Sequence, residues 1–446
     1  MLKKILATGD SDFKEVLVHS FFAFLVIGLA GIAQLVFNFV LGHKFGASGL
    51  GLYYLAYSFI FMLSLLGRLG FNRAVVKFIP GFVSQKEWGK LYGLKRTAER
   101  ITWLLTLILT AAILLLAGFF AHSIFHEPEA AKYLRVLALC LPLMSLSYVQ
   151  TGILSGLKLI RESVFLERAG VNLFAIFFVL IFAGWLGLDS AIIGTVIATY
   201  LTVLAANALI KKHVPRTGHI VPFDQKLLLG VALPLFFVDF SNQMTGQLNI
   251  LVLGAKSSAG VVGVFSAALQ VSAIIGIVLT GVNYITTTKI AELHSRAERS
   301  KLDLLASKTA ALGLLISLPL VIIFMVAPGP ILHIFGSSFN GGSLALRFLV
   351  IAQLINVGFG SVVQILSMTG YHKPLAYATV GTVFIMNVIL SLILVPIYGL
   401  NGAAAAVAIS LIAKNIILLI MIRRYLGIWS LPFRALGLWS KSLLRF

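Results

Sequence analysis

About twelve long apolar stretches run through the sequence, and their length restricts what the chain can fold into. Each holds roughly 20 residues, the length that an α-helix needs to cross the hydrocarbon core of a bilayer. The stretches lie near residues 17–41, 51–72, 101–121, 134–155, 169–186, 190–210, 229–253, 262–285, 309–328, 345–367, 375–396 and 402–421. They are too long and continuous for the alternating strands of a membrane barrel. With 59% hydrophobic and 11% charged residues, the chain is predicted to be an all-α, polytopic membrane protein.

The sequence also repeats itself at a constant offset of 212 residues. The matches include glycines, charges and helix ends, and they pair Leu41-Gly42 with Leu253-Gly254, Lys44 with Lys256, Gly51 with Gly263, Lys77 with Lys289, Arg135 with Arg347, and Gly187-Leu188 with Gly399-Leu400. Each repeat holds six of the apolar stretches, and an even number means that both repeats enter the membrane in the same direction. We therefore predict two parallel six-helix lobes, an arrangement that usually encloses a path for a transported molecule.

The positions of the basic residues predict the orientation. The net charge is +20, with 35 Lys and Arg against 15 Asp and Glu. Most of the cations fall in the two termini and the even-numbered loops, whereas five fall on the other side, namely Lys44, Lys132, Arg135, Lys256 and Arg347. This asymmetry predicts a multi-pass protein of the cytoplasmic membrane with both termini in the cytoplasm. The basic excess is thus topogenic, attracts anionic membrane lipids, and does not indicate a nucleic-acid partner.

Four regions follow from these patterns. We predict an amino-terminal lobe over 1–214, a cytoplasmic linker over 215–228, a carboxy-terminal lobe over 229–425 and a tail over 426–446. The tail places aromatic and aliphatic residues three or four apart with basic residues between them, as in a short basic amphipathic helix. Such a helix would lie on the inner membrane surface or dock a partner.

Motifs for catalysis are weak. Asp10-Ser11-Asp12 matches the pattern with which glycosyltransferases bind a metal and a nucleotide sugar, but no domain surrounds it. His122 and His126 are four residues apart, a spacing that could bind a metal, but they are better explained as histidines at the membrane interface. No glycine-rich phosphate loop precedes Lys256. The single cysteine, Cys140, allows no intrachain disulfide. We expect no enzyme activity and no cofactor, with H⁺ or Na⁺ as a possible coupling ion.

Among the acidic residues, Asp239 alone lies well within an apolar stretch. A charge at such depth costs roughly 2.5–3.5 kcal/mol on insertion scales and suggests function. At about 100° per residue, one helix face carries Asp239 together with Asn242, Gln243, Gln247 and Asn249. This face is either a polar seam between helices or a cavity wall with a titratable, ion-coupling carboxylate.

Several cations and amides are further candidates for substrate binding. Lys414 lies deep in the last stretch, where it could pair with Asp239 or bind an anionic substrate. A cluster at the inner end of the second stretch contains Arg68, Asn72, Arg73 and Lys77. Its members are either topogenic anchors or a cationic vestibule for a phosphate group. Gln34 and Asn38 share one face of the first stretch and give a weaker signal of a seam between helices or of a cavity wall.

The segment from Leu41 to Pro80 resembles the amino-terminal signature of the polysaccharide transporter family. The matching parts are Gly46-x-x-Gly49-x-Gly51-Leu52-Tyr53 and Leu69-Gly70-Phe71, followed by Arg73, Ala74 and Phe78. These are O-antigen-type oligosaccharide–lipid flippases of the multidrug/oligosaccharidyl-lipid/polysaccharide exporter superfamily. The resemblance implies a V-shaped pair of lobes that open alternately to either side. Its implied cargo is a polyprenyl-(pyro)phosphate-linked oligosaccharide, with polysaccharide polymerases or glycosyltransferases as possible partners.

Two other functions are weighed against this one. The first is an ion-coupled multidrug or small-solute antiporter of the same superfamily. Such relatives commonly use acids in both lobes, whereas the first lobe here has no deep carboxylate. The second is a membrane enzyme of envelope polysaccharide synthesis, which would need a large catalytic loop or an acid/base pair. The charge of the cavity separates the flippase from the antiporter, since an anionic cargo requires a positive lining and a cationic drug requires a negative one.

Overall fold

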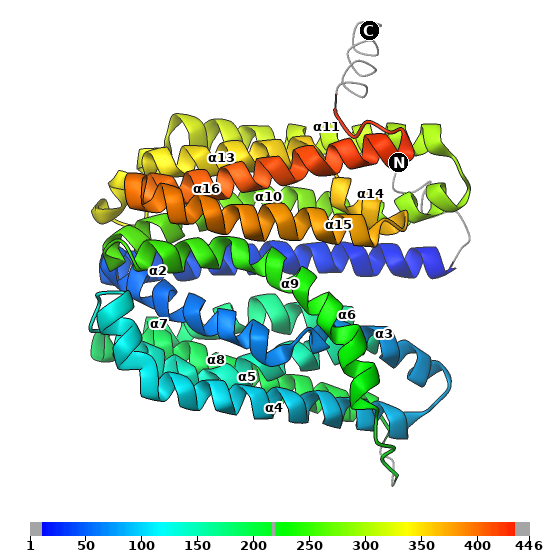
Figure 1. Cartoon of the computed structure of the whole chain (residues 1–446), viewed down its shortest axis with the longest axis horizontal. Coiled ribbons are helices and arrows are strands. Elements are labelled where there is room, and N and C mark those ends of the chain that lie inside the picture. The colour runs from blue at the N-terminus through cyan, green and yellow to red at the C-terminus, as the bar shows by residue number, and fades with distance from the viewer. Residues whose placement is uncertain (1–10, 216–218, 433–446) are drawn as a thin grey trace, which may run out of the picture.

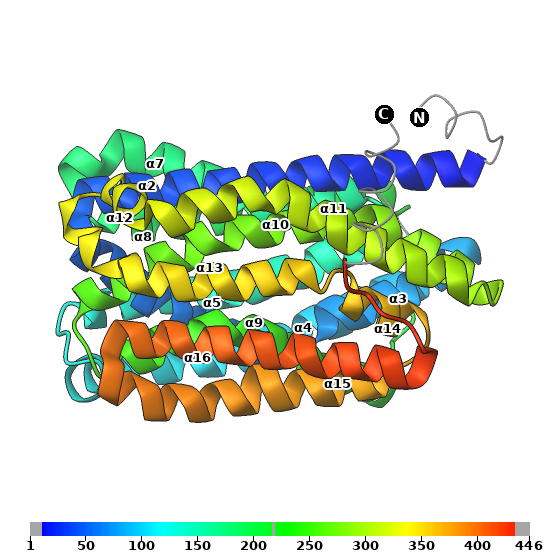
Figure 2. The ribbon, with the colours of Figure 1, turned by 90° about the horizontal axis from the view of Figure 1, so that it is seen from above.

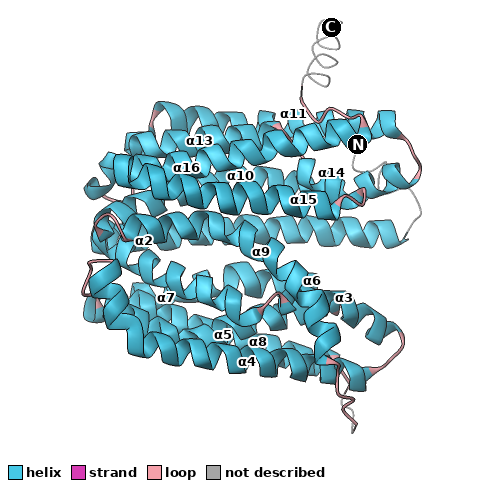
Figure 3. Ribbon diagram, in the orientation of Figure 1, coloured by secondary structure: helices cyan, strands magenta, loops and turns pink. Residues whose placement is uncertain are grey.

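The computed structural model describes residues 11–215 and 219–432, which form helices and short loops with no strand among them (Figure 3). The first repeat contains α2 (Ser11–Arg68), α3 (Phe71–Ser84), α4 (Trp88–Phe119), η1 (Phe120–Ile124), α5 (Ala130–Gly156), α6 (Ile160–Val164), η2 (Phe165–Gly170), α7 (Val171–Leu186) and α8 (Asp189–His213). The second contains α9 (Gln225–Gly254), α10 (Ala259–Ser295), α11 (Arg299–Val326), α12 (Pro328–His333), η3 (Ser337–Gly342), α13 (Ser343–Gly358), α14 (Val362–Met368), α15 (His372–Thr379), η4 (Val380–Met386) and α16 (Asn387–Leu426).

The long helices lie side by side along the longest axis, as expected for spans of one membrane (Figures 1 and 2). Among the described residues, nine helices are long and apolar enough to cross a bilayer, and a bent pair within α9 adds a tenth. Two of the ten, Val26–Arg68 and Lys373–Leu426, have 43 and 54 residues. Each contains two spans, because the backbone leaves the helical conformation at Gly46 in the first and Gly399 in the second. The twelve predicted stretches are thus accounted for, and the all-α, polytopic membrane fold is confirmed.

The backbone repeats the symmetry of the sequence. Gly187 has φ 54° and ψ −138°, and its equivalent Gly399 has φ 52° and ψ −126°. Both lie in the tight turn between the last two spans of their repeat. These positive φ values favour glycine, since a Cβ would be strained there. The turn between the last two spans therefore has the same backbone conformation in both repeats.

The lobes touch most closely at the end of the molecule that contains Gly46 and Gly399, called here the outer end because the charge pattern predicts that it faces away from the cytoplasm. At this end α2 crosses α10 with backbone against backbone. A Cβ added to Gly51 would lie 1.7 Å from the carbonyl oxygen of Ala259, and one added to Gly263 would lie 1.9 Å from that of Ala47. Gly51 and Gly263 are equivalents, so the contact lies on the pseudo-two-fold axis. Only glycine permits this approach.

Each lobe also caps a helix of the other lobe at the outer end. The Ala259 N–H, at the start of α10, donates to Oε1 of Glu127 at 2.7 Å. The Ala47 N–H, just after the break in α2, donates to Oγ of Ser338 at 3.2 Å. Ala47 and Ala259 are equivalents, and both N–H groups lack a partner in their own helix. The pair of caps holds the lobes together at this end.

Helix α9 bridges the two lobes. Its parts Gln225–Ser241 and Gln243–Gly254 meet at 54°, and in Figure 1 the helix crosses from one group of helices to the other. Leu228 of the first part packs into a buried cluster with Phe71, whereas Asn249 of the second part bonds to Asn387 within the second repeat. The lobe and linker boundaries expected from the sequence therefore stay predictions. Asp239 lies immediately before the bend.

The predicted tail is described only to residue 432. In this part the Arg423 guanidinium lies 5.1 Å from the centre of the Trp429 ring. The backbone N–H of Trp429 donates to Oδ1 of Asp303 at 2.8 Å, so the chain after α16 folds back onto the second lobe. The amphipathic helix expected for the rest of the tail lies outside the described residues, as does Asp10 of the acidic leader motif.

Candidate functional site

A break after Arg68 distinguishes the first repeat from the second. Leu69 has φ 43° and Gly70 has φ 76°, which ends α2 and starts α3 in a new direction. A Cβ on Gly70 would lie 2.5 Å from the Ala232 carbonyl oxygen, so the break packs directly against α9. The equivalent region of the second repeat lies inside the unbroken helix α10. The break thus brings a basic segment of the first repeat to the side of α9.

The cluster formed at this break is called here the Asp239 cluster and consists of Arg68, Asn72, Arg73 and Asp239. The Arg68 Nη2 and Asn72 Nδ2 atoms lie 3.2 and 3.3 Å from Oδ2 of Asp239. The Arg73 Nη2 atom lies 3.3 Å from Oδ1. Three donors of the first repeat therefore converge on one carboxylate of the second. With two guanidinium groups and one carboxylate, the cluster keeps a net positive charge.

The two arginines differ in their surroundings. The Arg68 side chain is 1% exposed and the Arg73 side chain is 61% exposed, while that of Asp239 is 9% exposed. The Arg68 guanidinium also lies over the ring of Tyr148, 3.9 Å from its centre, a cation–π contact that gains strength where water is excluded. Arg68 is therefore held between an aromatic face and a carboxylate, and it is the buried anchor of the cluster.

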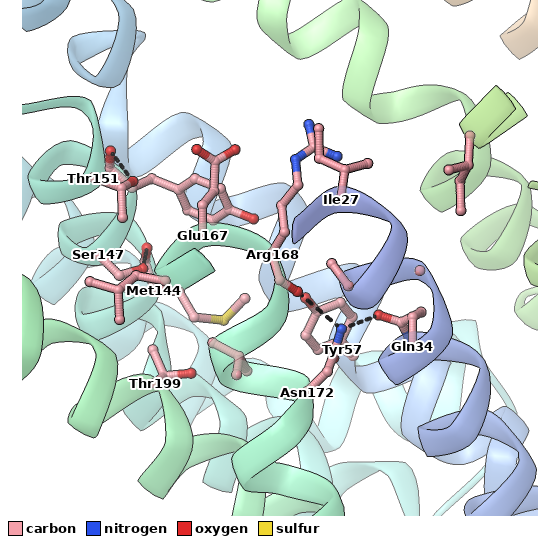
Figure 4. Close-up of a pocket in the computed structure, with 16 residues that line it drawn as sticks. Ile27, Gln34, Tyr57, Met144, Ser147, Thr151, Glu167, Arg168, Asn172 and Thr199 are labelled. Atoms are coloured by element: carbon pink, nitrogen blue, oxygen red, sulfur yellow. Dashed lines mark hydrogen bonds between the residues drawn. The ribbon is translucent and has the colours of Figure 1, made fainter. Parts of the chain in front are cut away.

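Tyr148 also lines a cavity of about 280 Å³. All of its lining residues except Ile277 belong to the first repeat (Figure 4). The polar groups that reach it are hydroxyls, amides and one pair of opposite charges, from Gln34, Tyr57, Ser147, Tyr148, Thr151, Glu167, Arg168, Asn172 and Thr199. Aromatic faces beside hydroxyls and amides suit a ligand with both apolar edges and hydroxyl groups. The cavity and the Asp239 cluster share Tyr148 as a common wall.

An amide and tyrosine network extends from the cavity to the other lobe. The Asn172 Nδ2 atom donates to Oε1 of Gln34 at 2.8 Å, as drawn in Figure 4, and the Gln34 Nε2 atom donates to the Tyr54 hydroxyl at 2.9 Å. That hydroxyl donates to Oδ1 of Asn38 at 2.5 Å and accepts from Gln270 of the second repeat at 3.4 Å. Gln34 therefore reaches the cavity, whereas Asn38 is fully buried behind it.

Of the two roles considered for Lys414, pairing with Asp239 or binding an anionic substrate, the pairing does not form in this structure. Asp239 pairs with Arg68 and Arg73 of the first repeat, because the helix break at Gly70 brings these cations to α9. Lys414 is half-buried in α16 and has no ion pair or hydrogen bond to the described residues. Lys77 is exposed and makes no hydrogen bond or ion pair with Asp239.

The polar residues predicted to share one face of α9 contact different parts of the molecule. The Gln247 Oε1 atom accepts from the Ser58 hydroxyl of α2 at 2.5 Å. Asn249 turns instead toward the second lobe, where it bonds to Asn387 and Ser391. Gln243 is half-buried without a polar partner in the described part of the chain, and the side chain of Asn242 lies outside the described residues. The bend of 54° separates Asp239 from Gln243, Gln247 and Asn249, which all lie in the part after it. Gln247 and Asn249 reach different neighbours because they lie about 160° apart around that part of the helix.

Several residues of the site were not singled out from the sequence. Tyr57 and Tyr148 line the cavity, and Asn172 and Arg168 do so from α7 and η2. For Tyr57 a signal existed, since it follows Tyr53 and Tyr54 at helical spacing on one span. Arg168 read as one more basic residue of a cytoplasmic loop. No group of three or more His, Cys, Asp or Glu with metal-binding geometry occurs among the residues that the structure describes.

Two family models match the sequence. The model of a family described as "Polysaccharide biosynthesis protein" matches residues 17–288, and the MatE model matches residues 234–393. The "Probable flippase AglR" of Haloferax volcanii is 25% identical over 174 residues. That alignment covers 38% of this chain and 36% of the relative, so the match spans about a third of the length of the curated relative.

Two solved structures share the fold. An inward-facing multidrug resistance MATE family transporter of the MOP superfamily superimposes with a TM-score of 0.75 at 16% identity, covering 91% of this chain and 98% of that one. The lipid II flippase MurJ in an inward closed conformation also gives 0.75 at 17% identity, covering 91% and 87%. At such identities the likeness concerns the fold alone.

Proposed function

The chain belongs to the polysaccharide biosynthesis protein family, and from this premise we propose that it is a flippase for a polyprenyl-(pyro)phosphate-linked oligosaccharide. One observation carries the proposal: a net positive cluster around Arg68 adjoins a hydroxyl- and amide-lined cavity through the shared wall of Tyr148. The name of the relative AglR as a probable flippase and the fold shared with a lipid II flippase support the same reading.

Each part of such a cargo has a counterpart in the structure. The guanidinium groups of Arg68 and Arg73 match the oxygens of a phosphate, since arginine presents a fork of donors. The cavity offers Gln34, Asn172 and tyrosine rings to a sugar, whose hydroxyls need amide partners and whose apolar faces stack on aromatic rings. The polyprenyl tail would stay in the bilayer, against the exposed apolar helix faces.

We further propose that the lobes alternate between two arrangements in the cytoplasmic membrane. In this structure the outer end is closed by the crossing of α2 and α10 and by the two reciprocal caps. Opening that end would release the cargo to the outer leaflet for a polymerase or glycosyltransferase. Asp239 is the proposed coupling group, because H⁺ or Na⁺ at its carboxylate would weaken its bonds to Arg68 and Arg73.

A flipping experiment tests this function and separates it from antiport. The purified chain in proteoliposomes should move a fluorescent polyprenyl-diphosphate-linked oligosaccharide between leaflets, measured by quenching from outside. Arg68→Ala/Arg73→Ala should abolish movement, because both guanidinium groups of the cluster are lost. The matched variant Lys44→Ala/Arg135→Ala removes two cations at the outer end and should keep it. Transport of a cationic dye with no movement of the lipid-linked sugar would instead support an ion-coupled antiporter.

A further inference from the structure

The donors of the Asp239 cluster form an anion site that is already filled. Two guanidinium groups and one side-chain amide from the first repeat all point at the two carboxylate oxygens of Asp239. Arginine forks with an amide are the donors that proteins use for phosphate as well as carboxylate. The part of the site formed by Arg68, Asn72 and Arg73 is called here the cradle. In this structure the second repeat supplies its anion.

The cradle has more binding capacity than a carboxylate uses. The Arg68 Nη1 atom is buried and has no hydrogen-bond partner among the described residues. The whole side chain is only 1% exposed. The Asn72 Oδ1 atom is also buried without a partner, but it is an acceptor and adds no capacity for an anion. An unsatisfied buried polar atom is costly and calls for an explanation. A phosphate or diphosphate, with more oxygens than a carboxylate and with ester groups beyond them, could reach Nη1 as well as Nη2.

The cradle can also be reached from outside. The Arg73 side chain is 61% exposed. The ring of Tyr148, which covers Arg68, also lines the cavity. An anion attached to a sugar in that cavity would lie beside the cradle. It could not share the cradle with Asp239, because two negative groups around 3–4 Å apart in a poorly solvated site repel strongly.

We infer that Asp239 is a resident counter-ion, which the diphosphate of the cargo displaces from the cradle. The inference rests on the proposed function and adds how cargo binding is linked to lobe movement. The pairing of Asp239 with Arg68 holds α9 against the break after α2. A cargo anion that takes its place releases this contact between the repeats. By linkage, the closed contact must weaken cargo binding by the same factor by which cargo weakens the contact.

Binding of inorganic pyrophosphate to the full-length protein in nanodiscs, followed by titration calorimetry, tests the exchange. Asp239→Asn removes the competing charge and keeps the side-chain size, so the variant should bind pyrophosphate about tenfold or more tightly than the unmodified protein. Asp239→Glu keeps the charge and should bind within about threefold of it. Asp189→Asn is the matched control, because it removes an acid paired with Lys132 far from the cradle, and it should leave affinity unchanged.

Equal or weaker pyrophosphate binding by Asp239→Asn would overturn the exchange. If that variant does not fold, hydrogen–deuterium exchange on the unmodified protein decides: pyrophosphate should speed exchange in the first part of α9, and unchanged or slower exchange there contradicts the proposal. The flippase function fails separately. If the unmodified protein flips the lipid-linked sugar but Asp239→Asn does not bind pyrophosphate more tightly, the protein is a flippase and the exchange is wrong. If Asp239→Asn binds pyrophosphate more tightly but the unmodified protein flips no lipid-linked sugar, the exchange stands and the cargo is a different anion.

Discussion

Replacing Gly51 with valine is expected to reduce flipping by about 10- to 100-fold while leaving the protein folded. A Cβ at this position would lie 1.7 Å from the Ala259 carbonyl oxygen and 2.9 Å from the Gly263 nitrogen. Both atoms belong to backbone, so no side-chain rotation relieves the overlap. Overpacking of this kind costs about 1–3 kcal/mol, and each 1.4 kcal/mol changes the population of the closed arrangement about tenfold. The lobes would then be unable to close at the outer end.

The equivalent variant and a control sharpen the Gly51 experiment. Gly263→Val should have the same effect, since its Cβ would lie 1.9 Å from the Ala47 carbonyl oxygen. Gly28→Ala lies on the same helix as Gly51 but meets nothing within 4 Å, and it should flip at the normal rate. The measurement is the initial flipping rate in proteoliposomes, with thermal unfolding in detergent as the test of folding. A normal rate for Gly51→Val would show that outer closure is not part of the transport cycle.

Arg68→Ala is expected to destabilise the protein by about 3–5 kcal/mol, because it leaves a buried carboxylate without its main partner. Arg73→Ala is expected to cost no more than about 1 kcal/mol, since an exposed side chain contributes little to an ion pair. The readout is the midpoint of thermal unfolding in detergent, which should fall clearly for Arg68→Ala and barely for Arg73→Ala. This ordering follows from burial alone, as both arginines lie at nearly the same distance from Asp239.

A double-mutant cycle separates the ion pair from the packing of Arg68 on Tyr148. Arg68→Ala/Asp239→Ala removes both charges, so it should be more stable than Arg68→Ala alone. Tyr148→Leu removes only the aromatic face and should lower stability less than Arg68→Ala. If Arg68→Ala and Arg73→Ala had equal effects, the buried anchor would be assigned to the wrong arginine.

Much of the fold could be predicted because membrane helices follow from local sequence. Apolar length alone predicts the spans, and the offset of 212 residues predicts pairs such as Gly187 and Gly399, which indeed share a backbone conformation. The bend in α9 could not be predicted, because it depends on packing of its first part against the first lobe. The two reciprocal caps, by Glu127 and Ser338, could not be predicted either, since each joins a connecting segment of one lobe to a helix of the other.

The candidate site was predicted in its members more than in its arrangement. Asp239 and the basic residues after the second span stood out because charges at membrane depth are rare. Their meeting was missed, since Lys414, which lies in the same lobe as Asp239, was the ion-pair partner considered for it. The actual partner, Arg68, is brought to α9 by the left-handed turn at Leu69 and Gly70. The equivalent region of the second repeat, within α10, has no such break.

Distances between the ends of the two lobes test the central claim, that cargo switches the protein between two arrangements. The only cysteine, Cys140, is buried, so spin labels can be placed on introduced cysteines. Gln85 and Ala297 are exposed equivalents at the inner end, and Glu129 and Gly341 are exposed equivalents at the outer end. Double electron–electron resonance should show that a lipid-linked oligosaccharide lengthens the distance between the outer labels and shortens the distance between the inner labels. Unchanged distances, or two distances that change in the same direction, would contradict alternating access.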